Sequence, residues 1–310
     1  MPRVWGNCQS KESAMAVTVK QLHPLFVGEI QNVDLSQPMD DAAFAEIQDA
    51  IDTNAVLIFH GPTLDEDAQA TFAERFGPLY ADNRLLKTGL KDRIGPKLVD
   101  ISNLNENNEK MDRNDRRRMF GLANQLWHTD ASFKKVTAKY SLLHAHTVVP
   151  EGGETQFADM RAAYDALPQK MKDRIEGMVA EHCIATSRAQ LGFTEFSDAE
   201  RAALPPVQHD LVRVHPVTGR KALYLASHAS HIVGMPLPEG RMLIRDLMEH
   251  ATQPQFVHTH TWQVGDLVIW DNRCTMHRAR PYDLDAYRRD MRRATVMDPD
   301  YMEGAVQKTA

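Results

Sequence analysis

The second half of the chain contains short runs rich in β-branched and aromatic residues, and this pattern constrains the fold more than any other feature. Such runs are typical of β-strands. They are 141–150 (SLLHAHTVVP), 155–160 (TQFADM), 221–228 (KALYLASH), 256–262 (FVHTHTW) and 266–272 (DLVIWDN). Helical stretches are expected only near 161–181 and 238–252, so few strands alternate with helices in βαβ fashion. We therefore predict a mostly β protein with flanking helices, folded as a double-stranded β-helix, or jelly roll, in a single domain.

The first third of the chain is expected to supply covering helices. Residues 41–53 place apolar side chains on one helical face, and the apolar run at 55–61 follows as a buried strand. Thr63 and Glu66 have the spacing of a capping box, which predicts that Thr63 opens the next helix, ending near Phe76.

Residues 81–118 are polar and irregular, and 105–118 (NENNEKMDRNDRRR) is dense in charge. A stretch of this kind is typical of a solvated loop, and next to a site it is a candidate active-site lid. No linker divides the chain, so we expect residues 15–310 to form one domain. We expect residues 1–14 to be a disordered extension, with Met15 as an alternative start.

Composition excludes several classes of protein. The net charge is −6, with 36 basic and 42 acidic residues, which argues against a nucleic-acid binder that works by bulk electrostatics. Three distant cysteines exclude a disulfide framework and thiolate-rich metal sites. No apolar run is long enough to span a membrane, and the N-terminus lacks the apolar stretch of a signal peptide. We expect a cytoplasmic protein.

One short motif suggests a metal site. His128 and Asp130 lie two residues apart in the segment WHTD, so on an extended chain both side chains point to the same side. His277, which follows a predicted strand, could supply a third ligand. Two histidines and one carboxylate form the facial triad of non-haem Fe(II) oxygenases, which leaves open coordination positions. The HxD pattern alone is common by chance.

Arginines are concentrated downstream of His277, with six between 278 and 293. They could form a solvated basic strand end. Alternatively, arginines four residues apart could hold carboxylates near a metal through bidentate hydrogen bonds.

Four ordered motifs carry a family resemblance: WHTD, PEGGETQFADMRAAYDAL, GDLVIWDNRCTMHRARPYD and RRDMRRAT. Together they resemble the taurine/2,4-dichlorophenoxyacetate dioxygenase family, whose members depend on Fe(II) and 2-oxoglutarate. The resemblance runs from about Leu22 to Pro299. It is strongest to the 2,4-dichlorophenoxyacetate branch.

The resemblance implies roles for individual residues. His128, Asp130 and His277 correspond to the iron ligands. Thr155 and Arg289 correspond to the pair that binds the distal carboxylate of 2-oxoglutarate.

The resemblance assigns Arg293 to the substrate anion. Arg288 is a rival for the co-substrate role, and Arg292 is a rival for the substrate role. Asn103 and Lys87 match positions that reach substrate or co-substrate from a variable loop.

The activity implied is hydroxylation of the side-chain carbon of an aryloxyacetate, which gives a phenol and glyoxylate while O2 and 2-oxoglutarate yield succinate and CO2. A sulfonate or sulfate-ester dioxygenase is the alternative within the family. A non-catalytic jelly-roll binding protein is the alternative from another class. We expect a small aryloxy carboxylate as substrate and a homo-oligomeric enzyme that binds neither nucleic acid nor membrane.

Overall fold

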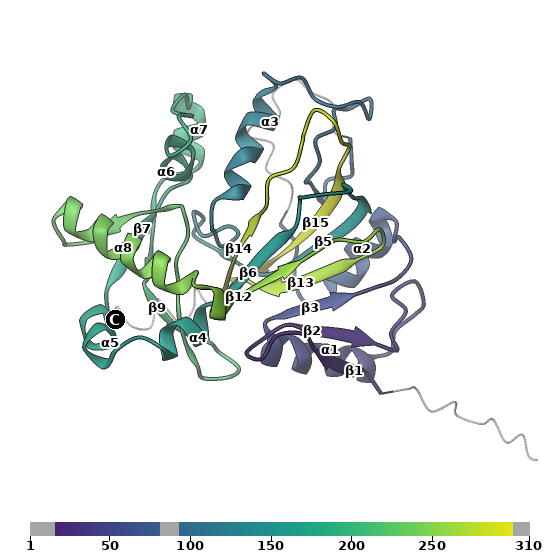
Figure 1. The fold of residues 1–310 in the computed structure, drawn as a ribbon, viewed down its shortest axis with the longest axis horizontal. Coiled ribbons are helices and arrows are strands. Elements are labelled where there is room, and N and C mark those ends of the chain that lie inside the picture. The colour runs from purple at the N-terminus through teal and green to yellow at the C-terminus, as the bar shows by residue number, and fades with distance from the viewer. Residues whose placement is uncertain (1–15, 81–92, 300–310) are drawn as a thin grey trace, which may run out of the picture.

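The computed structural model describes residues 16–80 and 93–299. Within them, the main sheet has seven strands in the order β1-β2-β3-β13-β5-β15-β4 (Figure 1). The strands are β1 (Thr18–Gln21), β2 (Gly28–Gln31), β3 (Val56–Phe59), β13 (Leu267–Asp271), β5 (Thr137–Thr147), β15 (Asp290–Asp298) and β4 (Val99–Asp100). Neighbouring strands are antiparallel except β2 and β3.

A smaller sheet has the order β12-β6-β14, and its described strands are all antiparallel. They are β12 (Val257–His260), β6 (Thr155–Asp159) and β14 (Thr275–Ala279). In this register His277 lies opposite Phe157, and Ala279 lies opposite Thr155. The register therefore places His277 and Thr155 two pairs apart on the same face of the small sheet.

The two sheets share a buried apolar cluster. Phe157 from β6 packs in this cluster with Trp270 from β13, Leu143 and Ala145 from β5, and Met291 from β15. All five side chains are at most 5% exposed. The sheets therefore pack face to face, and residues on their inner faces can reach a common space.

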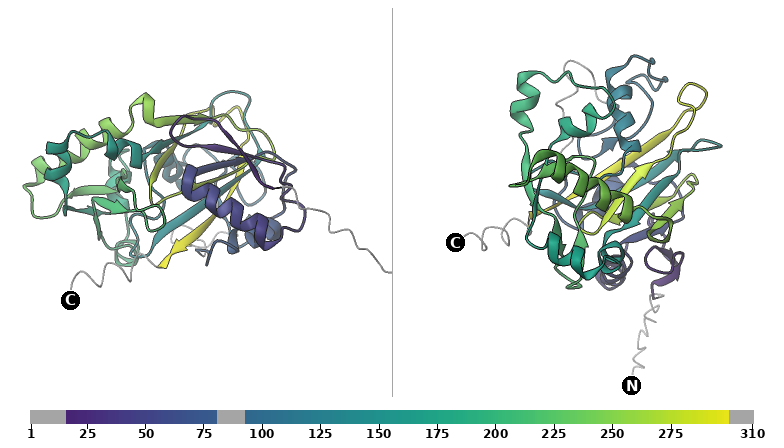
Figure 2. Two further views of the ribbon diagram at one scale, coloured as in Figure 1. Left: turned by 90° about the horizontal axis from the view of Figure 1, so that it is seen from below. Right: turned by 60° about the vertical axis from the view of Figure 1, so that its left-hand side comes forward.

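Two helices cover the outer face of the main sheet, as Figure 2 shows for α1 in the view from below. These are α1 (Asp41–Asn54) and α2 (Glu66–Glu74). Ile47 and Ile51 from α1 and Phe72 from α2 pack with Leu142 and Ile269 from the sheet. Because successive strand residues alternate between faces, this helical layer leaves the inner face to the site.

A third region joins the small sheet to a separate apolar core built around α4 and α8 (Figure 1). Its helices are α4 (Met160–Asp165), α5 (Gln169–Ile175), α6 (Ile184–Ala189), α7 (Asp198–Ala203) and α8 (Leu237–Ala251), with a short helical turn η3 (Pro254–Phe256). Its strands are β7 (Val179–His182), β8 (Val207–Asp210), β9 (Val212–Val214), β10 (Lys221–Leu223) and β11 (Ala229–Ile232). Before it in the chain come α3 (Arg116–Gly121) and η2 (Leu122–Gln125).

The prediction of a mostly β protein with flanking helices is confirmed, but two local predictions are wrong. The single helix expected over 161–181 is split into α4, α5 and strand β7, because Pro168 lacks an N–H and disfavours a helical residue before it. The capping box at Thr63 does not form. Asp65 caps α2 instead, by accepting a hydrogen bond from the Ala68 amide at 2.8 Å.

The segment 81–92 of the proposed lid, and the proposed extension at 1–14, lie outside the described residues. No helix within 16–80 or 93–299 combines the length and apolarity needed to cross a membrane.

The cap of α2 can be tested by mutation. Asp65→Ala removes the acceptor for the Ala68 amide and should lower the free energy of unfolding by about 1 kcal/mol. Thr63→Ala is the matched control and should leave it unchanged. Urea denaturation monitored by circular dichroism measures both. A lower free energy of unfolding in Thr63→Ala, with no change in Asp65→Ala, would support the capping box at Thr63 instead.

Candidate active site

The structure brings together His128, Asp130 and His277. His128 and Asp130 lie in the segment between η2 and β5, and His277 lies on β14. Backbone hydrogen bonds join the two histidines in both directions, at 2.9 Å and 2.8 Å. Asp130 Oδ1 is 3.9 Å from His128 Nε2, and Asp130 Oδ2 is 3.6 Å from His277 Nε2. One ligand atom from each residue therefore lies within 4.8 Å of the others.

The protonation states of these residues suit a divalent metal. His128 Nδ1 lies 2.8 Å from the Leu126 carbonyl, which can only accept, so Nδ1 carries the proton and Nε2 keeps its lone pair. Burial lowers the pKa of both His128 and His277, so both rings are neutral. Burial opposes ionisation of Asp130, yet the neighbouring Arg293 guanidinium and the hydrogen bond from Ser141 favour the charged form, and the pKa of this carboxyl is lowered. Two neutral imidazoles and one carboxylate are the donors that Fe(II) takes in a facial triad.

A network of hydrogen bonds with Ser141 and Asn272 orients Asp130. Ser141 on β5 donates from Oγ to Asp130 Oδ2 at 2.7 Å. The Asn272 carboxamide donates to Ser141 Oγ at 3.0 Å and accepts from the Asp130 amide at 3.1 Å. Trp270 Nε1 donates to the same Asn272 oxygen at 3.1 Å. The sequence analysis did not identify Ser141 or Asn272, although Asn272 lies in the WDN part of a recognised motif.

A cavity of ≈ 380 Å³ opens beside the three residues, and Thr155, Arg289 and Arg293 also line it. Thr155 Oγ1 accepts a hydrogen bond from Trp262 Nε1 at 3.0 Å, so its hydroxyl proton is free to donate elsewhere. Arg293 Nη1 lies 2.6 Å from Asp130 Oδ1.

Arg289 is a buried cation on the cavity wall. It is 6% exposed, and burial lowers its pKa. Its Nη2 donates to the Gly153 carbonyl at 3.4 Å, and no carboxylate in the described parts of the chain pairs with it. A buried guanidinium without an acid is costly unless a ligand brings one. Arg289 is thus suited to bind an anionic ligand.

The rival arginines point elsewhere. Arg288 donates to the Asn108 carbonyl at the surface. Arg292 pairs with Glu66 at 3.1 Å and with Asp290 at 3.5 Å. Neither rival lines the cavity.

Asn103 lines the cavity, but its carboxamide is occupied. Its Nδ2 donates to the carbonyls of Leu284 and Tyr287, at 3.1 Å and 2.8 Å. Its Oδ1 accepts from the Arg289 amide at 2.9 Å. These contacts hold the backbone of the segment that carries Arg289. Lys87, the other residue expected to reach a ligand from this region, lies outside the described residues.

The glycine pair of the GGET segment allows close packing of the loop beside Arg289. Gly153 has φ +69°, a left-handed conformation that favours glycine. A Cβ at Gly153 would lie 2.8 Å from Val149 Cγ2 and 3.6 Å from Arg289 Nε. At Gly152 a Cβ would come within 2.4 Å of the Pro281 carbonyl oxygen. A side chain at either position would therefore displace the loop that faces Arg289.

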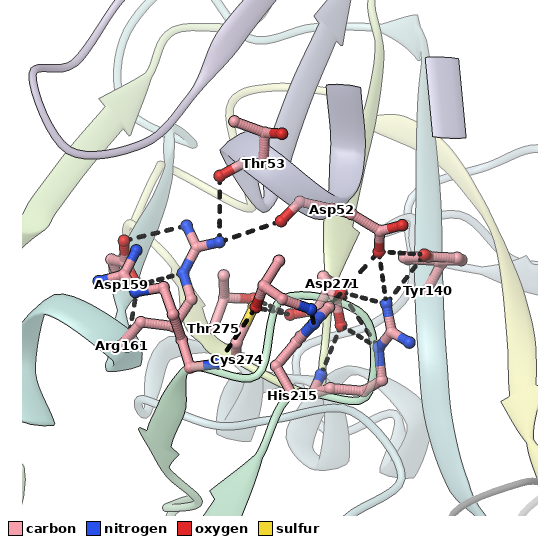
Figure 3. Close-up of polar contacts among 12 residues, drawn as sticks. Asp52, Thr53, Tyr140, Asp159, Arg161, His215, Asp271, Cys274 and Thr275 are labelled. Carbon is pink, nitrogen blue, oxygen red and sulfur yellow. Dashed lines mark hydrogen bonds and ion pairs between the residues drawn. The ribbon is translucent and has the colours of Figure 1, made fainter. Parts of the chain in front are cut away.

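A second group of residues that could bind a metal consists of His215, Asp271 and Cys274 (Figure 3). Here the Asp271 carboxylate already accepts from His215 at 2.9 Å and from Arg273 at 2.6 Å. Burial raises the pKa of the Cys274 thiol, which keeps it protonated. Because its acid is neutralised by an arginine, this cluster serves as an internal ion pair.

The comparisons with known proteins agree with this geometry. The profile of a family described as "Taurine catabolism dioxygenase TauD, TfdA family" matches residues 18–295. The chain belongs to this family. It is 46% identical to the alpha-ketoglutarate-dependent 2,4-dichlorophenoxyacetate dioxygenase of Cupriavidus pinatubonensis, over 92% of this chain and 99% of the relative. It is 34% identical to the (S)-phenoxypropionate/alpha-ketoglutarate dioxygenase of Sphingobium herbicidovorans, over 87% and 91% of the two chains.

A solved structure is also similar. AAD-2 in complex with Mn(II) and N-oxalylglycine has a TM-score of 0.86 and 47% identity to this chain, over 91% of this chain and 98% of that one. The family resemblance stated from the sequence is thereby confirmed.

The network behind Asp130 can be tested by metal binding. Ser141→Ala removes one hydrogen bond to the carboxylate and should weaken Mn(II) binding by roughly 10–100-fold, since such supporting partners orient ligands. Ser36→Ala, which changes an exposed serine bonded to Asp34, is the matched control. Isothermal titration calorimetry measures both affinities. Equal affinity of Ser141→Ala and the native protein would remove Ser141 from the site.

Proposed function

We propose that this protein is an Fe(II)- and 2-oxoglutarate-dependent dioxygenase that hydroxylates the side-chain carbon of an aryloxyacetate. The hydroxylated product collapses to a phenol and glyoxylate, while 2-oxoglutarate and O2 give succinate and CO2. The observation that carries the proposal is the juxtaposition, on one cavity, of a His-Asp-His set and a buried arginine without an acid. The 46% identity to a 2,4-dichlorophenoxyacetate dioxygenase supports the substrate class.

His128, Asp130 and His277 would hold the iron. When bound, Fe(II) with 2-oxoglutarate supplies the oxidising chemistry, which no side chain can provide. The contribution of the protein is position. The paired backbone bonds set the two imidazoles, and Ser141 and Arg293 hold the Asp130 carboxylate ionised and oriented.

Arg289 and Thr155 would bind the far carboxylate of 2-oxoglutarate. The guanidinium offers charge-assisted donors, and the Thr155 hydroxyl offers a further donor because its acceptor side is already used by Trp262. Because the Arg289 guanidinium is buried, only a ligand whose carboxylate extends into the cavity can reach it.

The cavity has an apolar wall that suits an aryl ring. Phe120, Leu122, Phe133, Ile184 and Trp270 all line it. Aliphatic and aromatic side chains both bind an aromatic ring by burying it, and the aromatic ones add edge-to-face contacts. A small zwitterion such as taurine would leave this wall without a partner.

Within the family, a sulfonate or sulfate-ester dioxygenase has less support. The chain is 29% identical to a sulfate ester dioxygenase of Pseudomonas putida, compared with 46% to the dichlorophenoxyacetate enzyme. A non-catalytic binding protein would not need three metal ligands converging in ligating protonation states.

We also propose that the facing sheets are the two halves of a double-stranded β-helix and that residues 15–310 form one domain. A cytoplasmic location, a homo-oligomeric state and a lid within 81–118 stay predictions.

The reaction itself is the first test. With Fe(II), 2-oxoglutarate and phenoxyacetate, the enzyme should release one phenol and one glyoxylate for each succinate formed. Liquid chromatography quantifies all three, with taurine and an alkyl sulfate as parallel substrates. Efficient sulfite or sulfate release without phenol would move this protein to the alternative branch.

The co-substrate arginine is the second test. Arg289→Gln removes a desolvated partner of a carboxylate, a loss of roughly 2–5 kcal/mol, so the KM for 2-oxoglutarate should rise at least about tenfold. Arg288→Gln is the matched control, one residue away and at the surface, and should leave this KM nearly unchanged. The reverse result would shift the assignment by one residue.

A further inference from the structure

We propose that Arg188, on α6, binds an oxygen substituent on the aryl ring of the substrate, so that the enzyme favours aryloxyacetates whose ring carries a hydrogen-bond acceptor. This inference rests on the proposed function. It leaves the two carboxylates of the reaction where the family resemblance puts them, with 2-oxoglutarate at Arg289 and the substrate carboxylate at Arg293 on β15. Arg188 is then a further cation on the cavity wall, and neither carboxylate uses it.

Arg188 is a buried guanidinium with few hydrogen bonds. The residue lines the cavity and is 7% exposed. A guanidinium has five N–H donors, and within the described residues Nη1 of Arg188 donates to Ser187 Oγ at 3.0 Å. Its Nε is buried and has no acceptor in the described parts of the chain. Burial lowers the pKa of Arg188 to about 10, so the side chain is still charged at neutral pH.

An arginine that stabilises the fold has a different pattern of contacts. Arg161 is 1% exposed, and it donates to the Asp159 carboxylate at 3.0 Å and to the Thr53 carbonyl at 3.1 Å (Figure 3). Such partners are expected for a buried charge, because a buried charge without them costs free energy. Arg188 has no carboxylate of this kind, so a ligand that brings an acceptor would satisfy it.

Arg293 lies directly beside the predicted metal ligands, with Nη1 2.6 Å from Asp130 Oδ1. A substrate carboxylate bound at Arg293 places the adjacent carbon, which is the one to be oxidised, close to these ligands. The ether oxygen and the ring follow that carbon. They must therefore extend along the cavity away from Arg293.

Arg188 is further from the predicted ligands than Arg293 is. The Ser187 hydroxyl to which it donates lies 2.9 Å from His228 Nδ1, and the His228 ring is 6.2 Å from the ring of His128. The His228 side chain thus connects Arg188 to the ligand His128. In the same way, the ether oxygen and the ring connect a ring substituent to the carbon that is oxidised. The position of Arg188 therefore suits the ring end of the substrate.

The residues around Arg188 suit an aryl ring. The Phe120 ring of α3 covers the guanidinium, with its centroid 3.9 Å from Arg188 Cζ. Ile184, one turn earlier on α6, lines the same cavity, as does Phe133, whose ring lies 4.9 Å from that of His228. In Figure 1, α3 and α6 stand on the same upper side of the molecule. The cation–π contact leaves the edge of the guanidinium, which carries the N–H donors, for a substituent of the bound ring.

The chemistry of the substituent follows from the unpaired charge. A nitro or carboxylate group offers oxygens that accept charge-assisted hydrogen bonds from a guanidinium. An alkyl group of the same size would leave the buried charge without a partner, which costs free energy. We therefore expect an oxygen acceptor at the 3- or 4-position of the ring, the positions that lie furthest from the ether oxygen.

The test compares ring substituents of similar shape. A nitro group accepts hydrogen bonds, whereas an isopropyl group does not. Calorimetry on the protein loaded with Mn(II) and N-oxalylglycine, the pair bound in the AAD-2 structure, gives the Kd of each compound without turnover. The native protein should bind 3- or 4-nitrophenoxyacetate at least roughly tenfold more tightly than the isopropyl analogue, as for one hydrogen bond to a charged group.

The corresponding carboxyphenoxyacetates test a fully anionic acceptor. A preference for the nitro or for the carboxy compound over the isopropyl analogue supports the inference. The larger of the two preferences identifies the acceptor as neutral or anionic.

Variants assign the preference to its residue. Arg188→Met removes the donors at similar side-chain length and should abolish the preference, with little change in the Kd of unsubstituted phenoxyacetate. Arg188→Lys keeps the charge without the planar fork and should keep part of the preference. Arg293→Gln should weaken binding of the nitro and isopropyl compounds by the same factor, because it acts on the carboxylate that both share.

Arg245→Met is the matched control, because Arg245 is an exposed arginine of α8 paired with Glu249. It should leave every Kd unchanged. Circular dichroism checks the fold of each variant.

Three results would overturn the inference. The first is equal affinity of the native protein for the nitro, carboxy and isopropyl compounds at both ring positions. The second is a preference that persists in Arg188→Met. The third is an equal loss of affinity for all compounds in Arg188→Met, including unsubstituted phenoxyacetate, which would mean that Arg188 only shapes the cavity. Failure of the native enzyme to oxidise any aryloxyacetate would instead overturn the proposed function.

Discussion

The site depends on one pair of backbone hydrogen bonds, those that join His128 to His277 in both directions. The segment that carries His128 and Asp130 belongs to no long strand. It joins the small sheet through this bridge and through the Thr129 hydroxyl, which donates to the Thr275 carbonyl at 3.2 Å. Because backbone geometry sets where each Cβ points, the bridge brings two imidazoles from positions far apart in sequence to one place, with ring centroids 4.2 Å apart. Ser141, on β5 of the main sheet, and Asn272 then hold the Asp130 carboxylate beside the two imidazoles. The three predicted ligands are thus held by contacts with both sheets.

Buried ion pairs tie the turn between β13 and β14, and the junction of β6 with α4, to the end of α1 (Figure 3). Arg273 donates to Asp271 and to Asp52, and Arg161 donates to Asp159 and to the carbonyl of Thr53. Pairs of this kind seldom add much net stability, since desolvation offsets attraction, but losing one partner leaves a buried charge. Their effect here is geometric, because they fix the position of the strand that carries His277 relative to the main sheet.

The fold class and the residues of the candidate site were predicted from ordered motifs and local periodicity in the sequence. Together with the family resemblance, the WHTD segment and the closing arginines predicted the His-Asp-His group and Arg289, which the structure places on one cavity. The choice between Arg288 and Arg289 could not be made from the letters, because it depends on which guanidinium is buried. Strand β15 was missed because its arginines resemble a solvated segment, although they alternate between the cavity and the outer face. The α2 cap was missed because Thr63 and Asp65 both fit a cap, and Asp65 is the one whose carboxylate reaches the Ala68 amide.

The three hydrogen bonds of Asn103 have a wider consequence. This side chain belongs to the segment that follows β4, and all of its bonds go to the backbone between Leu284 and Arg289. The polar segment after β4 and the arginine proposed for the co-substrate are therefore mechanically one piece. A ligand that shifts this segment also shifts Arg289 and so changes the affinity for the co-substrate. By thermodynamic linkage, binding of the co-substrate changes the affinity for that ligand by the same factor. Residue changes in that segment that broaden the range of substrates would then also retune the affinity for the co-substrate, so the two properties cannot evolve independently.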